Sequence, residues 1–266
     1  MAIPHSRSGL GVPMELRQAR ILLASLALGV TALALAPASA PAAKRVRGID
    51  VSRFQGKINW ERVGETRIKF AFVQASRGSG DDCAVAPDRC GGDEFYDRNY
   101  SLARAEGIRV GAYHRAFADG RGRKRARRDA RSEAKLFISE VGELHAGDLL
   151  PALDVETPFG RLNKKRLRIW VRTWLERVGS ELGQQPIIYT NSSSWRATGD
   201  TTRFARAGHH LWVANWGVKE PSVPADDWNG RGWSIWQHTS SGSVKGIKGR
   251  VDKNRLRGGL GEISVP

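Results

Sequence analysis

The amino-acid sequence predicts an α/β protein in which strands and helices alternate within one barrel-like domain. From residue 45 onward, short β-rich runs alternate with longer amphipathic segments, a pattern typical of parallel strands joined by helices. Seven or eight strands over about 220 residues fit one barrel better than two domains, since such barrels run to roughly 200 residues or more. The nine Trp residues and 40% hydrophobic content supply a sizeable core.

The expected elements follow one another in a regular order. Strands are predicted at 46–52, 69–75, 109–114, 149–155, 186–190, 210–215, 232–237 and 249–252. Helices are predicted at 60–65, 94–106, 129–141 and 164–182. The last three strands are linked mainly by loops, so the helical layer thins toward the C-terminus.

Residues 1–40 have the layout of a secretory signal peptide. Arg17 and Arg20 precede an apolar run at 21–36, which leads into the small-residue sequence Ala38-Ser39-Ala40. A membrane-spanning helix is the alternative, but the run is shorter than the roughly 20 apolar residues that a bilayer requires. We therefore expect cleavage near Ala40 and a secreted protein, extracellular or periplasmic.

The rest of the chain divides into one folded domain at 45–258 and a C-terminal tail at 259–266. Met14 directly precedes the charged residues of the signal, so a start at Met14 stays open as an alternative. Residues 1–13 would then be a mis-assigned start. No Cys follows the apolar run, so no lipid attachment and no stable membrane anchor are expected.

Export also favours a disulfide between Cys83 and Cys90, which enclose a short segment. Two free thiols in a reduced protein are the alternative. No His or further Cys lies close enough to make them a metal pair, and none of the six His stands in a ligand-spaced motif. No metal and no cofactor are expected.

The chain is strongly basic. Its formal net charge is +16, and removal of residues 1–40, with three Arg and one Glu, leaves +14. Such a surface attracts polyanions, among which export favours anionic polymers of a cell wall. The densest cluster, Arg121–Arg128, is either solvated loop charge or a site for such a polymer. It contains no recognisable nucleic-acid motif, so no nucleic-acid partner is expected.

Carboxylates gather where strands are predicted to end. Asp50 lies near the end of the first strand, while Asp154 and Glu156 end the fourth and share one face of it. Two close carboxyls in a partly buried mouth cannot both ionise freely, so one pKa should rise. This yields the acid and the base that glycoside cleavage requires. The alternative is that Asp154 caps a turn and Glu156 pairs with an Arg.

Aromatic and amide side chains favour a sugar site. Tyr113 and Tyr189 fall at the ends of other strands, Trp216 follows a further one, and Gln237 ends the next. Sugar rings stack on aromatic faces, while amides and hydroxyls satisfy their polar groups. Trp170 and its neighbour one helical turn on are expected to pack in the core.

These residues form an ordered series that resembles the glycoside hydrolase family 25 muramidases. The resemblance covers residues 47 to about 256 and rests on segments that occur in the family's order: Gly48–Gly56, Ile58–Trp60, Lys69–Val73, Gly111–His114, Pro151–Glu156, Ile188–Thr190, Leu211–Trp216, Trp236–Gln237 and Val251–Asn254.

The resemblance implies a flattened, incomplete β/α (TIM-like) barrel that cleaves the β-1,4 bond between N-acetylmuramic acid and N-acetylglucosamine in peptidoglycan. It implies that Glu156 is the general acid/base and that Asp154 orients or stabilises the reacting N-acetyl group. Asp50 would complete the acidic mouth, and Asp252 would lie in the same cleft.

The chain departs from the family at Gln74 and Arg77, where a Lys and a Glu are usual, so its substrate preference is open. A wall-binding module without catalysis and a hydrolase of another N-acetylated glycan, such as chitin, stay open as alternatives.

Overall fold

The computed structural model describes residues 45–79 and 90–266, so the predicted signal peptide and Cys83 lie outside the described residues. The predicted disulfide to Cys90 therefore stays a prediction. Within the described ranges, no helix is long and apolar enough to cross a membrane.

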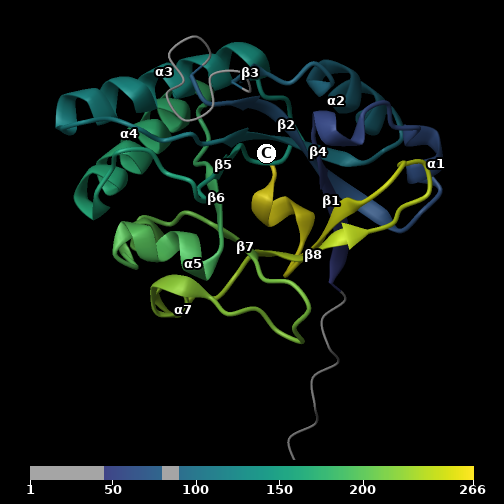
Figure 1. The fold of residues 1–266 in the computed structure, drawn as a ribbon. Coiled ribbons are helices and arrows are strands. Elements are labelled where there is room, and N and C mark those ends of the chain that lie inside the picture. Colours follow the sequence, from purple (N-terminus) through teal and green to yellow (C-terminus); the bar gives the residue numbers. More distant parts are fainter. Residues whose placement is uncertain (1–44, 80–89) are drawn as a thin grey trace, which may run out of the picture. The chain divides into compact units, whose positions relative to one another are not determined.

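Eight strands form a closed ring (Figure 1). The short strand β3 is not part of this ring and pairs only with β2. Neighbours pair in the order β1-β2-β4-β5-β6-β7-β8-β9, and the β9–β1 pair completes the circle. The strands are β1 (Val46–Val51), β2 (Ile68–Arg77), β3 (Gly91–Gly92), β4 (Arg109–Arg115), β5 (Ala152–Asp154), β6 (Ile187–Thr190), β7 (Leu211–Ala214), β8 (Ile235–Gly242) and β9 (Val251–Leu256). The predicted α/β barrel is confirmed, and it is incomplete in its helices rather than in its ring of strands.

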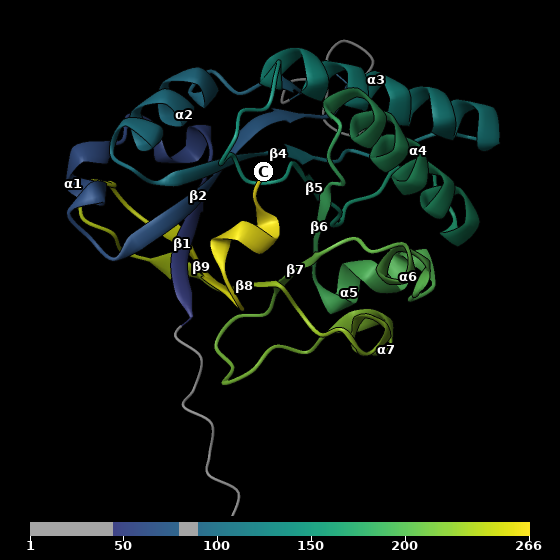
Figure 2. The same cartoon turned by 180° about the vertical axis from the view of Figure 1, so that it is seen from behind.

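Apart from η5, which follows the last strand, the helices lie between strands along the chain, and the longer ones cover the outside of the ring (Figures 1 and 2). The longer ones are α2 (Tyr96–Ala105), α3 (Arg123–Val141) and α4 (Lys164–Leu182). The short ones are η1 (Arg53–Gln55), α1 (Trp60–Gly64), α5 (Ser192–Trp195), η4 (Arg196–Thr198), α6 (Arg203–Arg206), α7 (Pro224–Gly230) and η5 (Leu260–Ile263). Residues 225–229 of α7 have left-handed backbone angles. No helix separates β8 from β9, as the sequence predicted.

Two apolar layers hold the barrel together. Inside the ring, large side chains such as Phe70, Phe72 and Trp212 fill the space, and the Phe72 and Trp212 rings stack with centroids 4.6 Å apart. Between the ring and the helices lies a second core, in which Phe137 of α3 packs against Trp174 of α4. The interior is therefore packed, and only the strand ends are free to build a site.

The structure adds the short helices α5, α6 and α7 and shifts the bounds of β8 to 235–242 and of β9 to 251–256. Three further differences from the sequence prediction concern β9, β5 and α3. Strand β9 runs antiparallel to both of its neighbours, whereas a parallel barrel was expected. Strand β5 begins at Ala152 rather than at Leu149, which instead bridges to Ser264. Helix α3 begins at Arg123, six residues before the prediction, so part of the basic cluster at 121–128 is helical rather than loop. Its start carries no side-chain cap and no acidic residue, which are the usual signals for a helix N-terminus.

The C-terminal segment, which the sequence analysis sets apart as a tail, packs on the barrel. It contains η5, whose Ile263 is buried among the residues inside the ring. The Leu150 amide donates to the Ile263 carbonyl, and the Val265 amide donates to the Asp148 carbonyl. In Figures 1 and 2 this segment lies in the middle of the ring.

Candidate active site

A cleft of about 580 Å³ opens where the parallel strands end. Four carboxyl side chains line it, namely Asp50, Asp154, Glu156 and Asp252. Asp252 reaches this mouth from the start of β9, because that strand is antiparallel and stands opposite Asp50 in the register. The structure therefore brings together all four of the acids that the sequence analysis selected.

A hydrogen-bond network holds Asp50. The Gln237 amide donates to its Oδ1 and Oδ2 at 3.1 and 3.0 Å, and also to Asp252 Oδ2 at 3.2 Å. Asn254 Nδ2 donates to Asp50 Oδ2 at 2.7 Å, while Trp212 Nε1 donates to Asn254 Oδ1 at 2.8 Å. Three strands thus fix the orientation of one carboxyl group.

Burial dominates the acidity of this side of the cleft. Burial, followed by the charge of Asp252, raises the pKa of Asp50 well above its ordinary value, while the bonds from Asn254 and Gln237 act in the opposite direction. Burial also raises the pKa of Asp252 to about 6. These two carboxyls therefore keep their protons to higher pH than exposed aspartates do.

Arg115 links the two acids at the end of β5. Its guanidinium lies 3.4 Å from Asp154 Oδ2 through Nε, and 3.4 Å from Glu156 Oε1 through Nη2. It also donates to the carbonyls of Glu156 and Thr157, each at 2.9 Å. The predicted pairing of Glu156 with an Arg is therefore present, and this ion pair lies inside the cleft.

The two linked acids differ in exposure. The Asp154 side chain is 9% exposed and that of Glu156 is 30% exposed. Burial raises the pKa of Asp154 well above its ordinary value, and the positive charge of Arg115 opposes this rise. Asp154 Oδ1 has no hydrogen-bond partner in the part of the chain that the structure describes.

Aromatic residues complete the cleft. Tyr113 and Tyr189 line it, and the Tyr189 hydroxyl donates to Gln237 Oε1 at 3.0 Å. Trp216 is 52% exposed, and its Nε1 donates to the same oxygen at 3.0 Å. Of the predicted substrate-binding residues, Tyr113, Tyr189, Gln237 and Asp252 thus line the cleft, while Trp216 joins it through Gln237.

One rim of the cleft carries positive charge. The Gln74 oxygen accepts from Arg77 Nε and Nη2 at 2.9 and 3.1 Å when its amide nitrogen faces the Tyr113 hydroxyl, 3.3 Å away. The Arg77 guanidinium lies 5.4 Å from the ring centroid of Phe54, a side chain that is 76% exposed. The two departures from the family pattern therefore contact each other and line the cleft.

Sequence reasoning missed Arg115, Asn254 and Phe54 as parts of the site. For Arg115 the signal was alternation, because it stands two residues after Tyr113 and so on the same face of β4. Asn254 stands two residues after Asp252 on β9 in the same way. Phe54 follows the strand in η1 and gives no comparable signal. Among residues 45–79 and 90–266, no cluster of three or more His, Cys, Asp or Glu has the arrangement of a metal site.

A closed β/α barrel whose mouth holds several carboxyls beside aromatic residues has the architecture of a glycoside hydrolase. Comparison with known proteins agrees: residues 49–247 match the family model "Glycosyl hydrolases family 25". The chain is 30% identical over 225 residues to Lysozyme M1 of Streptomyces globisporus, covering 82% of this chain and 70% of that protein. It is 34% identical over 234 residues to the uncharacterized protein YegX of Escherichia coli K12, covering 85% and 74% of the two chains.

Among solved structures, the bacterial lysozyme of Streptomyces coelicolor superposes with a TM-score of 0.71 at 30% identity. The match covers 84% of this chain and 96% of that one. The chain therefore belongs to glycosyl hydrolase family 25, and it is a glycoside hydrolase of the lysozyme type.

Proposed function

We propose that this protein is a secreted N-acetylmuramidase that cleaves the β-1,4 bond between N-acetylmuramic acid and N-acetylglucosamine in peptidoglycan. The observation that carries the proposal is the pair Asp154 and Glu156, which one guanidinium holds at the mouth of a cleft. Glycoside cleavage needs a proton donor at the leaving oxygen and a second group that stabilises the positive charge of the transition state.

Glu156 is the general acid/base in this proposal. It is the more exposed member of the pair, and it lies in the turn after β5, where the glycosidic oxygen of a strand lying in the cleft comes within reach. Arg115 contacts its carboxylate and its carbonyl, which restricts the side chain to one region of the cleft. Holding a proton donor in place is worth several orders of magnitude in rate.

Asp154 orients the N-acetyl group of the substrate. Its carboxyl group lines the cleft with 9% of the side chain exposed, and it can accept a hydrogen bond from a substrate amide N–H. Such a bond favours the ionised carboxylate and opposes the effect of burial on its pKa. Asp50 and Asp252 complete the acidic wall, while Tyr113, Tyr189 and Trp216 offer rings and donors to the sugars.

The proposal includes export with cleavage near Ala40. It is supported by the basic residues, the apolar run and the small-residue site at 17–40. Expression of the full chain followed by N-terminal sequencing of the protein in the medium tests this part, and a start at residue 41 is the expected result.

The catalytic part is tested by incubating the parent and Glu156→Gln with purified peptidoglycan and identifying the new reducing sugar. We expect muramic-acid reducing ends from the parent and a loss of at least about a hundredfold in Glu156→Gln, because general acid catalysis contributes 10²–10⁴-fold. Glu176→Gln is the matched control, since its side chain is exposed on α4, and it should keep full activity.

Retained activity in Glu156→Gln would remove the acid role from this residue. Binding to peptidoglycan without sugar release by the parent would favour a wall-binding module. Faster release from chitin than from peptidoglycan would favour another N-acetylated glycan as substrate.

A further inference from the structure

A second cavity, of about 820 Å³, lies on the outside of the barrel wall and shares no lining residue with the active-site cleft. It is formed by β1, β8, β9 and the segment that leads into β2. Because Phe70 and Leu256 point into the ring, their neighbours Lys69 and Arg255 point outward into this cavity. We call it the basic groove.

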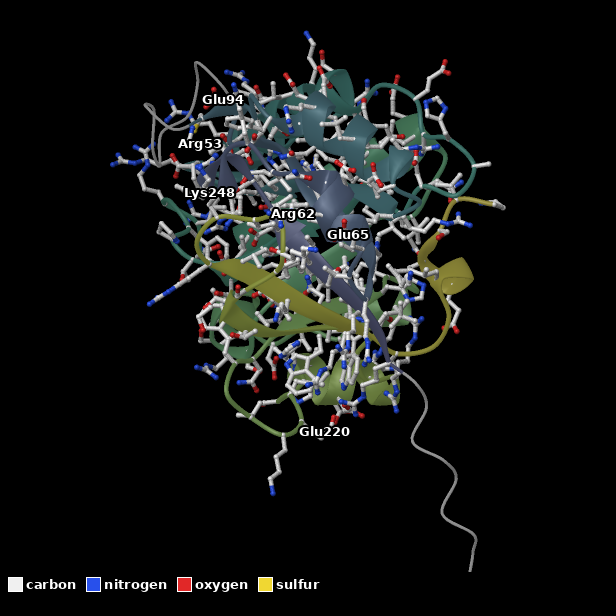
Figure 3. All side chains as sticks on the ribbon, turned by 90° about the vertical axis from the view of Figure 1, so that its right-hand side faces the viewer. Arg53, Arg62, Glu65, Glu94, Glu220 and Lys248 are labelled. Carbon is white, nitrogen blue, oxygen red and sulfur yellow. The ribbon has the colours of Figure 1, made fainter. Side chains whose placement is uncertain are left out.

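The basic groove is lined by seven cations and no carboxylate, the cations being Arg45, Arg47, Arg67, Lys69, Lys245, Lys253 and Arg255. Two of them have acidic partners at the edges, where Arg45 pairs with Glu220 at 2.6 Å and Lys245 pairs with Glu65. Figure 3 looks onto this side of the molecule, where Glu65 and Glu220 are labelled above and below the wall. The other five cations form no ion pair within the described part of the chain.

The positive charges of three groove cations act on the same histidine. Burial, followed by the charges of Arg255, Lys253 and Arg47, lowers the pKa of His238 in the groove to about 4. Arg255 also lies 5.2 Å from the ring centroid of Trp236, which holds its guanidinium in position. Like charges that converge in this way repel one another, so the groove is electrostatically unfavourable until an anion enters it.

The lining also limits what the anion can be. Apart from His238 no aromatic side chain lines the groove, so the bases of a nucleic acid find no ring on which to stack. None of the exposed large hydrophobic residues in the described ranges lies there, so the groove offers no large apolar side chain that could insert into a lipid surface. The cavity is also far larger than one phosphate ion, which favours a chain of several anionic groups.

We propose that the basic groove binds a phosphodiester-linked anionic polymer of the cell wall. This inference rests on the proposed function, because the substrate wall supplies the polymer. Since the groove and the cleft are lined by different residues, the polymer and a glycan strand can be bound at the same time. The groove then keeps the enzyme on its substrate between cleavage events.

The test compares two triple variants with the same change in charge. The groove variant is Arg47→Gln, Lys69→Gln, Lys253→Gln, and the control is Lys124→Gln, Arg127→Gln, Arg128→Gln in the basic cluster on α3. Binding of poly(glycerol phosphate) is measured by calorimetry at low and high salt. We expect the groove variant to bind about 10- to 100-fold more weakly at low salt, because each exposed cation contributes roughly two- to fivefold. The control should change little, and high salt should remove the difference.

Equal weakening in both variants would overturn the groove, because net charge alone would then explain binding. Weakening only in the control would place the polymer on α3. Single-stranded DNA and anionic lipid vesicles serve as competing probes, and a greater dependence of either on the three groove residues would also overturn the proposal.

Sugar release from peptidoglycan stripped of anionic polymers is measured in parallel, and it should be the same in the parent and in both variants. Absence of this activity in the parent would refute the proposed function, whatever the binding results show.

Discussion

The two sides of the barrel are built differently. On the side of β2, β4 and β5, the helices α2, α3 and α4 cover the strands, and polar groups between the layers are buried in pairs. His114 Nε2 lies 2.7 Å from Glu133 Oε2, and the other ring nitrogen lies 2.8 Å from Ser76 Oγ. On the side of β8, β9 and β1, the outer face carries the cations of the basic groove, and the polar network lies at the mouth.

The difference teaches that the two sides hold their acids at the mouth of the barrel by different means. Burial lowers the pKa of His114 to about 3 and raises that of Glu133 to about 8, so at neutral pH both are uncharged and form a neutral hydrogen bond rather than an ion pair. The antiparallel β9 instead sets Asp252 beside Asp50 and brings Asn254 within reach of it. The helix-covered side carries Asp154 and Glu156 at the end of a strand that is held by packing, whereas the other side holds Asp50 and Asp252 through the polar network.

The largest effect is expected from Phe137→Ala on the helix-covered side. Phe137 is fully buried, and its ring centroid lies 5.2 Å from that of Trp174, so the change leaves a cavity worth about 3–5 kcal/mol. Urea unfolding measures the loss of stability, and kcat at a temperature where the variant is folded should stay near that of the parent. Leu102→Ala, at a side chain 39% exposed, is the control and should cost far less. A large fall in kcat for folded Phe137→Ala would show that this packing also sets the geometry of the acids at the end of β5.

Asn254→Ala is the counterpart on the other side, with a smaller effect on stability of about 1–3 kcal/mol from the lost buried hydrogen bonds. The Asn254 bond lowers the pKa of Asp50, so its removal raises that pKa further. If the ionised form of Asp50 is needed, the acidic limb of the pH profile of kcat shifts to higher pH, and activity at neutral pH falls about tenfold. Asn229→Ala loses an exposed bond to Arg206 and places Ala in a left-handed backbone conformation, so it costs some stability, but it should leave the pH profile unchanged. An unshifted profile in Asn254→Ala would mean that the network has only a structural role.

Glu133→Gln gives the smallest effect, which is a change in how steeply the free energy of unfolding depends on pH. Between pH 6.5 and 8 the unfolded carboxyl is ionised, whereas the folded one, with a pKa of about 8, still binds a proton. The free energy of unfolding of the parent therefore falls as pH rises through this window, by up to about 1.4 kcal/mol per pH unit from this group. The variant cannot titrate here, so its curve should be flatter, while exposed Glu181→Gln should follow the parent. Parallel curves for Glu133→Gln and the parent would show that the buried carboxyl is ionised throughout.

Most of the fold could be predicted from the sequence, because runs such as Lys69–Val73 and Ile187–Thr190 are apolar, β-rich and bounded by turns. The direction of β9 could not, since the alternation in Val251–Leu256 is the same for either direction of pairing. Only the closing of the ring places Asp252 opposite Asp50, about 200 residues away along the chain.

The acids of the site could be predicted because strand ends in a β/α barrel meet at one mouth. Their partners could not be predicted in the same way. An Arg at the end of a strand is as compatible with solvent as with a cleft, and Arg115 becomes part of the site only because β5 places Asp154 beside it.

The C-terminal segment has a consequence for how a polysaccharide enters. With Ile263 inserted among the side chains inside the ring, and with Phe72 and Trp212 stacked there, the barrel is a cup with a floor rather than a tunnel. A sugar chain cannot thread through it and must lie across the rim, with both ends free in solvent. Such a binding mode allows cuts in the interior of long strands, with no need for a free end from which to begin.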